Sequence, residues 1–185
     1  MKLVVGLGNP GKRYQGTRHN VGYAVLAELG RRFGAGTPKA KFHGEVLDAD
    51  LQGVRALLLS PTTYMNRSGL SVQAARAFYK IPEDDILVIC DDLNLPVAKL
   101  RIRRGGSSGG QKGLEDIIRR LGTDQFPRLR IGIGGPAGPG DAVGHVLGRM
   151  SSEERELVEQ AVQDGADAAA VWAREGIDAC MNRYN

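Results

Sequence analysis

Two short, uninterrupted apolar runs constrain the fold more than any other feature of the chain. Lys2–Gly6 (KLVVG) and Ile86–Cys90 (ILVIC) lack the polar alternation of a strand that has one face in water. Continuous runs of this length are typical of strands covered on both faces, as in the parallel sheets of α/β proteins. We therefore expect a sheet with helices packed against both of its sides.

Helical and extended patterns interleave along the rest of the chain. The expected helices are Thr17 to about Phe33 with Thr17 as the N-cap, Ser71–Tyr79, Leu114–Leu121, and a segment that runs from a capping box at Ser151, Ser152 and Glu154 to about Arg174. The other expected strands are Glu45–Leu51 and Val54–Leu59, a hairpin around Gln52-Gly53, then Lys99–Arg103 and Arg128–Gly134. With 185 residues, no internal repeat and no linker, the chain is expected to form one α/β domain, residues 1–185, with a mixed β-sheet sandwiched between α-helices.

The charge is distributed unevenly along the chain. The formal net charge is only +4, yet residues 1–42 carry +7 and residues 97–130 carry +6, while residues 43–96 and 151–185 carry −4 and −5. If the two basic segments meet in space, they form a face that binds a polyanion such as a nucleic acid. The alternative is a solvated surface of mixed charge.

Several classes of protein are disfavoured. No stretch approaches the roughly 20 apolar residues of a membrane helix, and the apolar run after Met1 is short and broken by glycines, unlike a signal peptide. The two cysteines, Cys90 and Cys180, cannot form a disulfide framework, and the three histidines have no metal-ligand spacing. We expect a reduced, cytoplasmic protein without a metal or cofactor, in which Cys90 is a small buried hydrophobe.

Two glycine-rich segments imitate nucleotide-binding motifs. Gly6–Gly11 (GLGNPG) matches G-x-G-x-x-G, but Pro10 and Gly16 delay the start of the helix to about Thr17. The first backbone amides of the helix therefore lie too far from the glycines to bind a pyrophosphate. Gly105–Gly113 (GGSSGGQKG) places glutamine before its lysine and glycine after it, so a P-loop hydroxyl for magnesium is missing. We expect neither a dinucleotide site nor nucleotide hydrolysis.

The second glycine-rich segment keeps another possibility open. The loop Gly105–Gly110 precedes a helix, and Lys112 lies at the positive end of that helix. This arrangement suits an anion. A flexible surface loop explains the same composition equally well.

Three polar clusters each follow an apolar segment. The first is Asn9 with Tyr14 and Thr17–Asn20, the second is Tyr64–Asn66, and the third is Asp91-Asp92. Sites in open α/β sheets form beyond the carboxyl ends of the strands, so the three clusters are expected to converge at one edge. A histidine, a carboxylate and two carboxamides in one cleft are typical of a hydrolytic site.

The chemistry of these residue types suggests their roles. His19, oriented by a carboxylate, is a candidate general base near neutral pH. No G-x-S-x-G nucleophile elbow occurs, so we expect direct attack by water. Asn66 is a candidate donor to that water or to the oxyanion, and Asn9 to the substrate beside the scissile carbonyl. The alternatives are that His19 is a capping or packing residue and that Asp91-Asp92 only begins a turn.

Six motifs in a fixed order extend these observations to most of the chain. They are GLGNPG with Tyr14, TRHN at 17–20, PTTYMNRSG at 61–69, DDLNLP at 91–96, GGSSGGQKGL at 105–114 and RLRIGIG at 128–134. Together they resemble bacterial peptidyl-tRNA hydrolases from Lys2 to about Asn185. The resemblance implies a monomer with a single α/β domain and a twisted mixed sheet. It also implies hydrolysis, without a metal, of the ester between peptide and tRNA, which recycles tRNA from peptidyl-tRNAs that leave the ribosome early.

The resemblance also implies roles for four catalytic residues. His19 matches the general base of the family and Asp91 the acid that orients it. Asn66 matches the residue that positions the substrate and stabilises the intermediate. Asn9 matches the asparagine that binds the peptide backbone next to the ester, a contact that favours N-blocked substrates.

Further residues are implied in binding the peptide and the tRNA. Tyr14 and Tyr64 match aromatic residues that contact the substrate, and Arg103 and Arg130 match a basic clamp on acceptor-stem phosphates. The family usually has His-Asn where this chain has Gln111-Lys112, and that asparagine contacts the substrate. Lys112 cannot accept a hydrogen bond, so we expect altered fine positioning in this loop, compensated by a phosphate contact. That replacement keeps one alternative open, a catalytically silent RNA-binding protein with the same fold.

Overall fold

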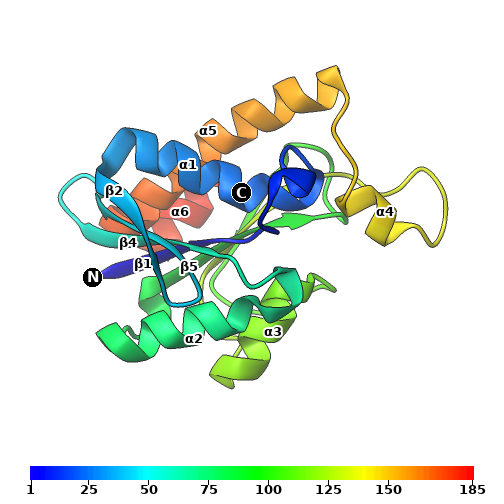
Figure 1. The fold of residues 1–185 in the computed structure, drawn as a ribbon. Helices are drawn as coiled ribbons and strands as arrows, with labels where there is room; N and C mark the ends of the chain where they lie inside the picture. Colours follow the sequence, from blue (N-terminus) through cyan, green and yellow to red (C-terminus); the bar gives the residue numbers. More distant parts are fainter.

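The computed structural model describes all residues, 1–185, as one layered α/β domain (Figure 1). Its mixed seven-stranded sheet has the order β2-β3-β4-β1-β5-β7-β6, in which β1 pairs in parallel with β4 and β5, and β5 with β7. The strands are β1 Lys2–Gly6, β2 Gly34–Lys41, β3 Gly44–Asp50, β4 Arg55–Pro61, β5 Ile86–Asp92, β6 Leu100–Arg103 and β7 Arg128–Gly132. The carboxyl ends of β1, β4, β5 and β7 therefore share one edge of the sheet.

Helices cover both faces of the sheet, as the apolar runs predict. The helices are α1 Val21–Phe33, α2 Ser68–Tyr79, α3 Lys112–Leu121, α4 Ala142–Val146, α5 Ser152–Glu175 and α6 Ile177–Tyr184. Helices α1, α5 and α6 pack on one face, α2 and α3 pack on the other, and α4 projects beside the sheet (Figure 1). No helix is long and apolar enough to cross a bilayer.

The central strand β1 contributes side chains to two separate cores. Val4 belongs to the cluster between the sheet and α1 and α5, whereas Leu3 and Val5 belong to the cluster against α2 and α3. All three side chains have no exposed surface. Full burial of a side chain of this kind is worth about 1.5–3 kcal/mol, so both faces stabilise the strand.

The first helix begins later than the sequence predicts. Residues Arg18–Asn20 form a separate 3₁₀ turn, and the Thr17 hydroxyl donates to the carbonyl of Tyr14 instead of capping a helix. The prediction of Thr17 as an N-cap is therefore wrong. The Asn20 carboxamide binds both backbone groups of Asn9, which ties this turn to the loop after β1 and fixes where α1 starts.

The structure has elements that the sequence pattern did not predict. Strand β2 is exposed along its whole length and contains glycine, proline and lysine, so it has no hydrophobic alternation. Pro38 and the lysines suit an edge strand, because they discourage pairing with another chain. Helix α6 follows a break at Gly176 and was also missed, whereas the Gln52-Gly53 hairpin is confirmed, with φ of 57° and 95° as its turn requires.

Candidate active site

The three polar clusters converge, as predicted, around one cavity of about 430 Å³ at the carboxyl edge of the sheet. The loop after β1 supplies Asn9 and Tyr14, and the turn before α1 supplies His19. The segment after β4 supplies Tyr64–Asn66, and the end of β5 supplies Asp91. The start of α3 and the short helix α4 complete the walls.

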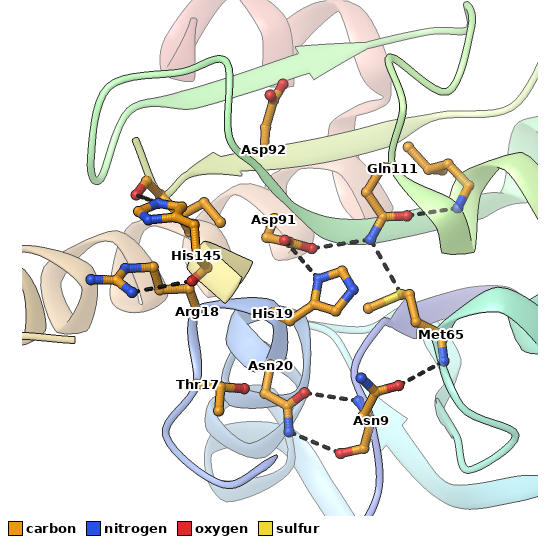
Figure 2. A network of polar contacts seen from close by, with 12 residues as sticks. Asn9, Thr17, Arg18, His19, Asn20, Met65, Asp91, Asp92, Gln111 and His145 are labelled. Atoms are coloured by element: carbon orange, nitrogen blue, oxygen red, sulfur yellow. Dashed lines mark hydrogen bonds and ion pairs between the residues drawn. The ribbon is translucent and has the colours of Figure 1, made fainter. Parts of the chain in front are cut away.

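His19 and Asp91 form a buried pair at the bottom of this cavity. The His19 Nδ1 lies 2.7 Å from Asp91 Oδ2, and the two residues are 8% and 2% exposed (Figure 2). Because an ionised carboxylate only accepts hydrogen bonds, Nδ1 carries the proton and donates it. The other ring nitrogen, Nε2, has no partner in the protein, and His19 lines the cavity. The geometry is that of an imidazole held ready to take a proton.

Gln111 satisfies the second oxygen of Asp91. The Gln111 Nε2 donates to Asp91 Oδ1 at 3.0 Å, and its Oε1 accepts from the backbone N–H of Leu114 at the start of α3. In the sequence, Gln111 stands out only as a departure from the P-loop pattern and from the family pattern. Its place before a helical pattern was the available signal, although glutamine is not a common N-cap.

Asn9 is oriented by two other parts of the site. Its Oδ1 accepts from the backbone N–H of Met65 at 2.7 Å, while Asn20 holds its backbone (Figure 2). Since an amide whose oxygen accepts must turn its nitrogen the other way, the Nδ2 group of Asn9 is fixed in direction. That group has no protein partner, and Asn9 lines the cavity. A donor is thus available to a ligand.

More exposed side chains surround the mouth of the cavity. Tyr64 is 55% exposed, and its backbone has a φ of 62°, a left-handed conformation that strains a residue other than glycine. Tyr14 meets Tyr64 edge to face, with ring centroids 6.3 Å apart. Asn66 and Lys112 are exposed and line the same cavity.

The structure does not bring the two arginines of the expected clamp into equivalent positions. Arg103 is exposed on the edge strand β6 and lies outside the cavity. Arg130, on β7, lines the cavity but is only 9% exposed, and its guanidinium donates to the carbonyls of Ser107 and Ser108. Together with Arg128, which donates to the carbonyls of Gly106 and Ser107, it holds the loop 105–110 against the sheet.

Sequence reasoning missed the apolar wall of the cavity. This wall consists of Ala142, Val143, Val146 and Leu147, on or next to α4. Arg18 anchors it, because its guanidinium binds the His145 carbonyl and makes a paired contact with Glu154, which lowers the pKa of that carboxyl. The segment is too short and too exposed to give a periodic signal.

Cys90, next to Asp91 on β5, does not line the cavity. Cys90 is fully buried behind Asp91, and burial raises the pKa of its thiol to about 12, so it is the small buried hydrophobe that the sequence predicts. No group of three or more His, Cys, Asp or Glu residues is placed to hold a metal ion. The polar groups that face the cavity are an imidazole, carboxylates, carboxamides and cations.

A histidine–aspartate pair with amide donors in a sheet-edge cavity is typical of a hydrolytic site. The family model of peptidyl-tRNA hydrolase matches residues 3–185. The chain is 51% identical to the peptidyl-tRNA hydrolase of Rhodopirellula baltica, over all of this chain and 97% of that protein. It is 46% identical to that of Desulforamulus reducens, over all of this chain and 89% of that protein.

Solved structures give the same result. The crystal structure of peptidyl-tRNA hydrolase from Acinetobacter baumannii superposes with a TM-score of 0.94 and 38% identity, over all of this chain and 94% of that chain. The chain belongs to the peptidyl-tRNA hydrolase family, and it is a hydrolase that acts on an ester bond.

Proposed function

We propose that this protein hydrolyses the ester bond between peptide and tRNA in peptidyl-tRNAs released prematurely from the ribosome, with His19 as general base. The observation that carries the proposal is the His19–Asp91 pair, in which Nδ1 is bound and Nε2 is left to the cavity. A merely packing histidine needs no buried carboxylate behind it. Burying Asp91 at 2% exposure costs free energy, which fits a functional role.

In the proposed reaction, these groups act on one water molecule and the ester. His19 Nε2 accepts a proton from a water molecule while the water oxygen attacks the ester carbonyl carbon. The imidazolium then gives that proton to the departing ribose oxygen as the C–O bond breaks, leaving the peptide carboxylic acid and free tRNA. General-base assistance is worth roughly 10²–10⁴ in rate. Asn66 donates to the oxyanion, a contact worth roughly 10²–10³.

Asn9 supplies the preference for N-blocked substrates. Its Nδ2–H group has no acceptor within the protein, and the carbonyl oxygen of the peptide bond next to the ester can accept its hydrogen bond. An unblocked aminoacyl ester has a cationic amino group there and no such oxygen. Tyr14 and Tyr64 contact the substrate at the mouth of the cavity, next to the apolar wall around α4.

Basic residues outside the catalytic pair bind the tRNA acceptor stem and 3′ end. Arg103 is exposed, and Lys112 is exposed at the cavity mouth with only a 3.6 Å contact to Glu115. Arg130 is the third member, although its hydrogen bonds to the loop leave it less free than Arg103. We further propose that the protein acts as a cytoplasmic monomer.

The test is release of tRNA from N-acetyl-aminoacyl-tRNA by the natural protein and by His19→Ala, with and without EDTA. We expect turnover in both conditions and a loss of at least about 100-fold in the variant. Equal rates would refute the role of His19. No release by either protein, with tRNA still bound, would favour the alternative of a silent RNA-binding protein.

A further inference from the structure

Gln111 has a buried carboxamide whose oxygen and nitrogen both form hydrogen bonds within the protein. It follows the loop 105–110, caps α3 and is 8% exposed. Its Oε1 accepts from the Leu114 N–H at 2.8 Å, so the amide nitrogen must face the other way. There it lies 3.0 Å from Asp91 Oδ1 and 3.2 Å from Met65 Sδ (Figure 2). The cap thus fixes the direction of a donor that points at Asp91.

We propose that Gln111 is a positioning residue for the catalytic pair, an inference that rests on the proposed roles of His19 and Asp91. A buried carboxylate with two fixed donors has one orientation. Removing the Gln111 donor leaves Asp91 Oδ1 unsatisfied, so the carboxylate rotates or admits water, and His19 loses its alignment. Small displacements of this kind reduce rate far more than binding.

The same residue joins the base to the substrate-binding side of the cavity. Met65 contacts Gln111 through its sulfur and holds the Asn9 carboxamide through its backbone N–H. A continuous series of contacts therefore runs from Asn9 through Met65 and Gln111 to Asp91 and His19. Gln111 is its central member, so it fixes the base relative to the donor that binds the peptide.

A neutral donor at this position also matters for the charge of the site. The charged groups around the pair include Asp92, next to Asp91 on β5, and Arg130, whose Nη1 lies 3.8 Å from Asp92 Oδ2. Arg18, which precedes His19 in the chain, is paired with Glu154. Lys112 and Glu115 on α3 are exposed and contact each other, and the Cys90 thiol is neutral because burial raises its pKa to about 12. Gln111 thus satisfies Asp91 without adding a charge that titrates beside His19.

Three substitutions separate positioning from capping. Gln111→Asn keeps a good N-cap but is too short to reach both Leu114 and Asp91. Gln111→Glu keeps the length and the acceptor for Leu114, but as a carboxylate it repels Asp91 and stabilises the imidazolium of His19. Gln111→His keeps a long side chain with an N–H donor and a second nitrogen that accepts.

The readouts are kcat, KM, the pH profile of kcat/KM on N-acetyl-aminoacyl-tRNA, and Tm. We expect Gln111→Asn to lose about 10-fold or more in kcat with KM within about 3-fold, since a small misplacement of the reacting groups can cost up to about 100-fold in rate. Gln111→Glu should move the ascending limb of the profile upward by about one pH unit, from Coulomb interaction at this range. Gln111→His should recover at least half of the decrease in log kcat that Gln111→Asn causes. The Tm of all three variants should stay within about 3 °C of the natural protein, as for a retained cap.

The inference fails if Gln111→Asn and Gln111→Glu both retain kcat/KM within 2-fold and keep the pH limb in place while His19→Ala still abolishes release. It also fails if all three variants lose rate only in proportion to a lowered Tm, because Gln111 is then a structural cap. If His19→Ala releases tRNA at the natural rate, the proposed function fails instead.

Discussion

The bottom and the mouth of the catalytic cavity are built in opposite ways. The pocket floor, which we define as Asn9, His19, Met65, Asp91 and Gln111, is 8% exposed or less, and its members are joined by hydrogen bonds. The pocket rim, defined as Tyr14, Tyr64, Asn66 and Lys112, is more exposed, and its side chains donate or accept no hydrogen bond within the protein. The floor is therefore arranged before the substrate arrives, whereas the rim side chains are ordered by it.

This difference predicts how substitutions divide between rate and affinity. Floor residues should change kcat, because their geometry determines the alignment of the reacting groups. Rim residues should change KM, because each immobilised side chain costs roughly 0.5–1.5 kcal/mol that substrate contacts must offset. Asn66 is the informative exception, since it belongs to the rim by exposure but is proposed to act on the transition state.

The largest effect is expected for Asp91→Asn. An asparagine whose oxygen accepts from Gln111 presents its N–H to His19 and no longer stabilises the imidazolium, so the required tautomer is lost. We expect a loss of about 10⁴ in kcat, as for the loss of an orienting carboxylate in other histidine-based hydrolases, with KM nearly unchanged. Single-turnover kinetics measure this, and a loss smaller than 10-fold in a folded variant would contradict the account of the floor.

A smaller loss is expected for Asn66→Ala. Removal of one oxyanion donor should lower kcat by about 100-fold. The comparison variant is Lys112→Ala, which truncates another exposed rim residue of the same cavity. If both variants change only KM, then Asn66 acts like the rest of the rim and not on the oxyanion.

Tyr64→Gly tests the rim by two measurements at once. Glycine relieves the strained φ of 62°, so the free energy of unfolding should rise by about 1 kcal/mol at most. Loss of the exposed ring should raise KM a few-fold and leave kcat within about 2-fold, because the ring contributes contact area only. Chemical denaturation and steady-state kinetics check these outcomes. A large fall in kcat would show that Tyr64 helps to align the reacting groups, as the floor residues are proposed to do.

The smallest effect is expected for Arg103→Ala, outside the cavity. If Arg103 contacts one phosphate, the slope of log Kd against log salt should change by somewhat less than 1. Hydrolysis of a small N-acetyl-aminoacyl ester that lacks the acceptor stem should be unaffected. An unchanged salt dependence would remove Arg103 from the tRNA-binding surface.

The sequence predicted the convergence of the polar clusters better than the contacts that hold them in place, and for a physical reason. Continuous apolar strands are local signals, and parallel topology then places the residues after β1, β4 and β5 together. The contacts of Gln111 and the wall around α4 depend on tertiary packing, which no local pattern shows. Strand β2 has no hydrophobic pattern at all, because an exposed edge needs none.

The uneven distribution of charge along the sequence overstates how many basic side chains are free to bind a polyanion. In the first basic segment Arg31 and Arg32 pair with Glu28, and Arg18 pairs with Glu154. In the second, Arg128 and Arg130 are buried on loop carbonyls. Sequence counts these cations as equal, whereas the structure leaves only some of them, such as Arg103, facing solvent.

The tautomer of His19 in the free protein tests the central claim most directly. Nitrogen-15 NMR of the histidine rings, assigned by comparison with His19→Ala, reports which nitrogen carries the proton before any substrate is present. We expect Nδ1 to be protonated and Nε2 unprotonated at pH 8, and this preference to be lost in Asp91→Asn. A ring protonated at Nε2, or averaged between the two tautomers, would show that the base is not arranged in advance.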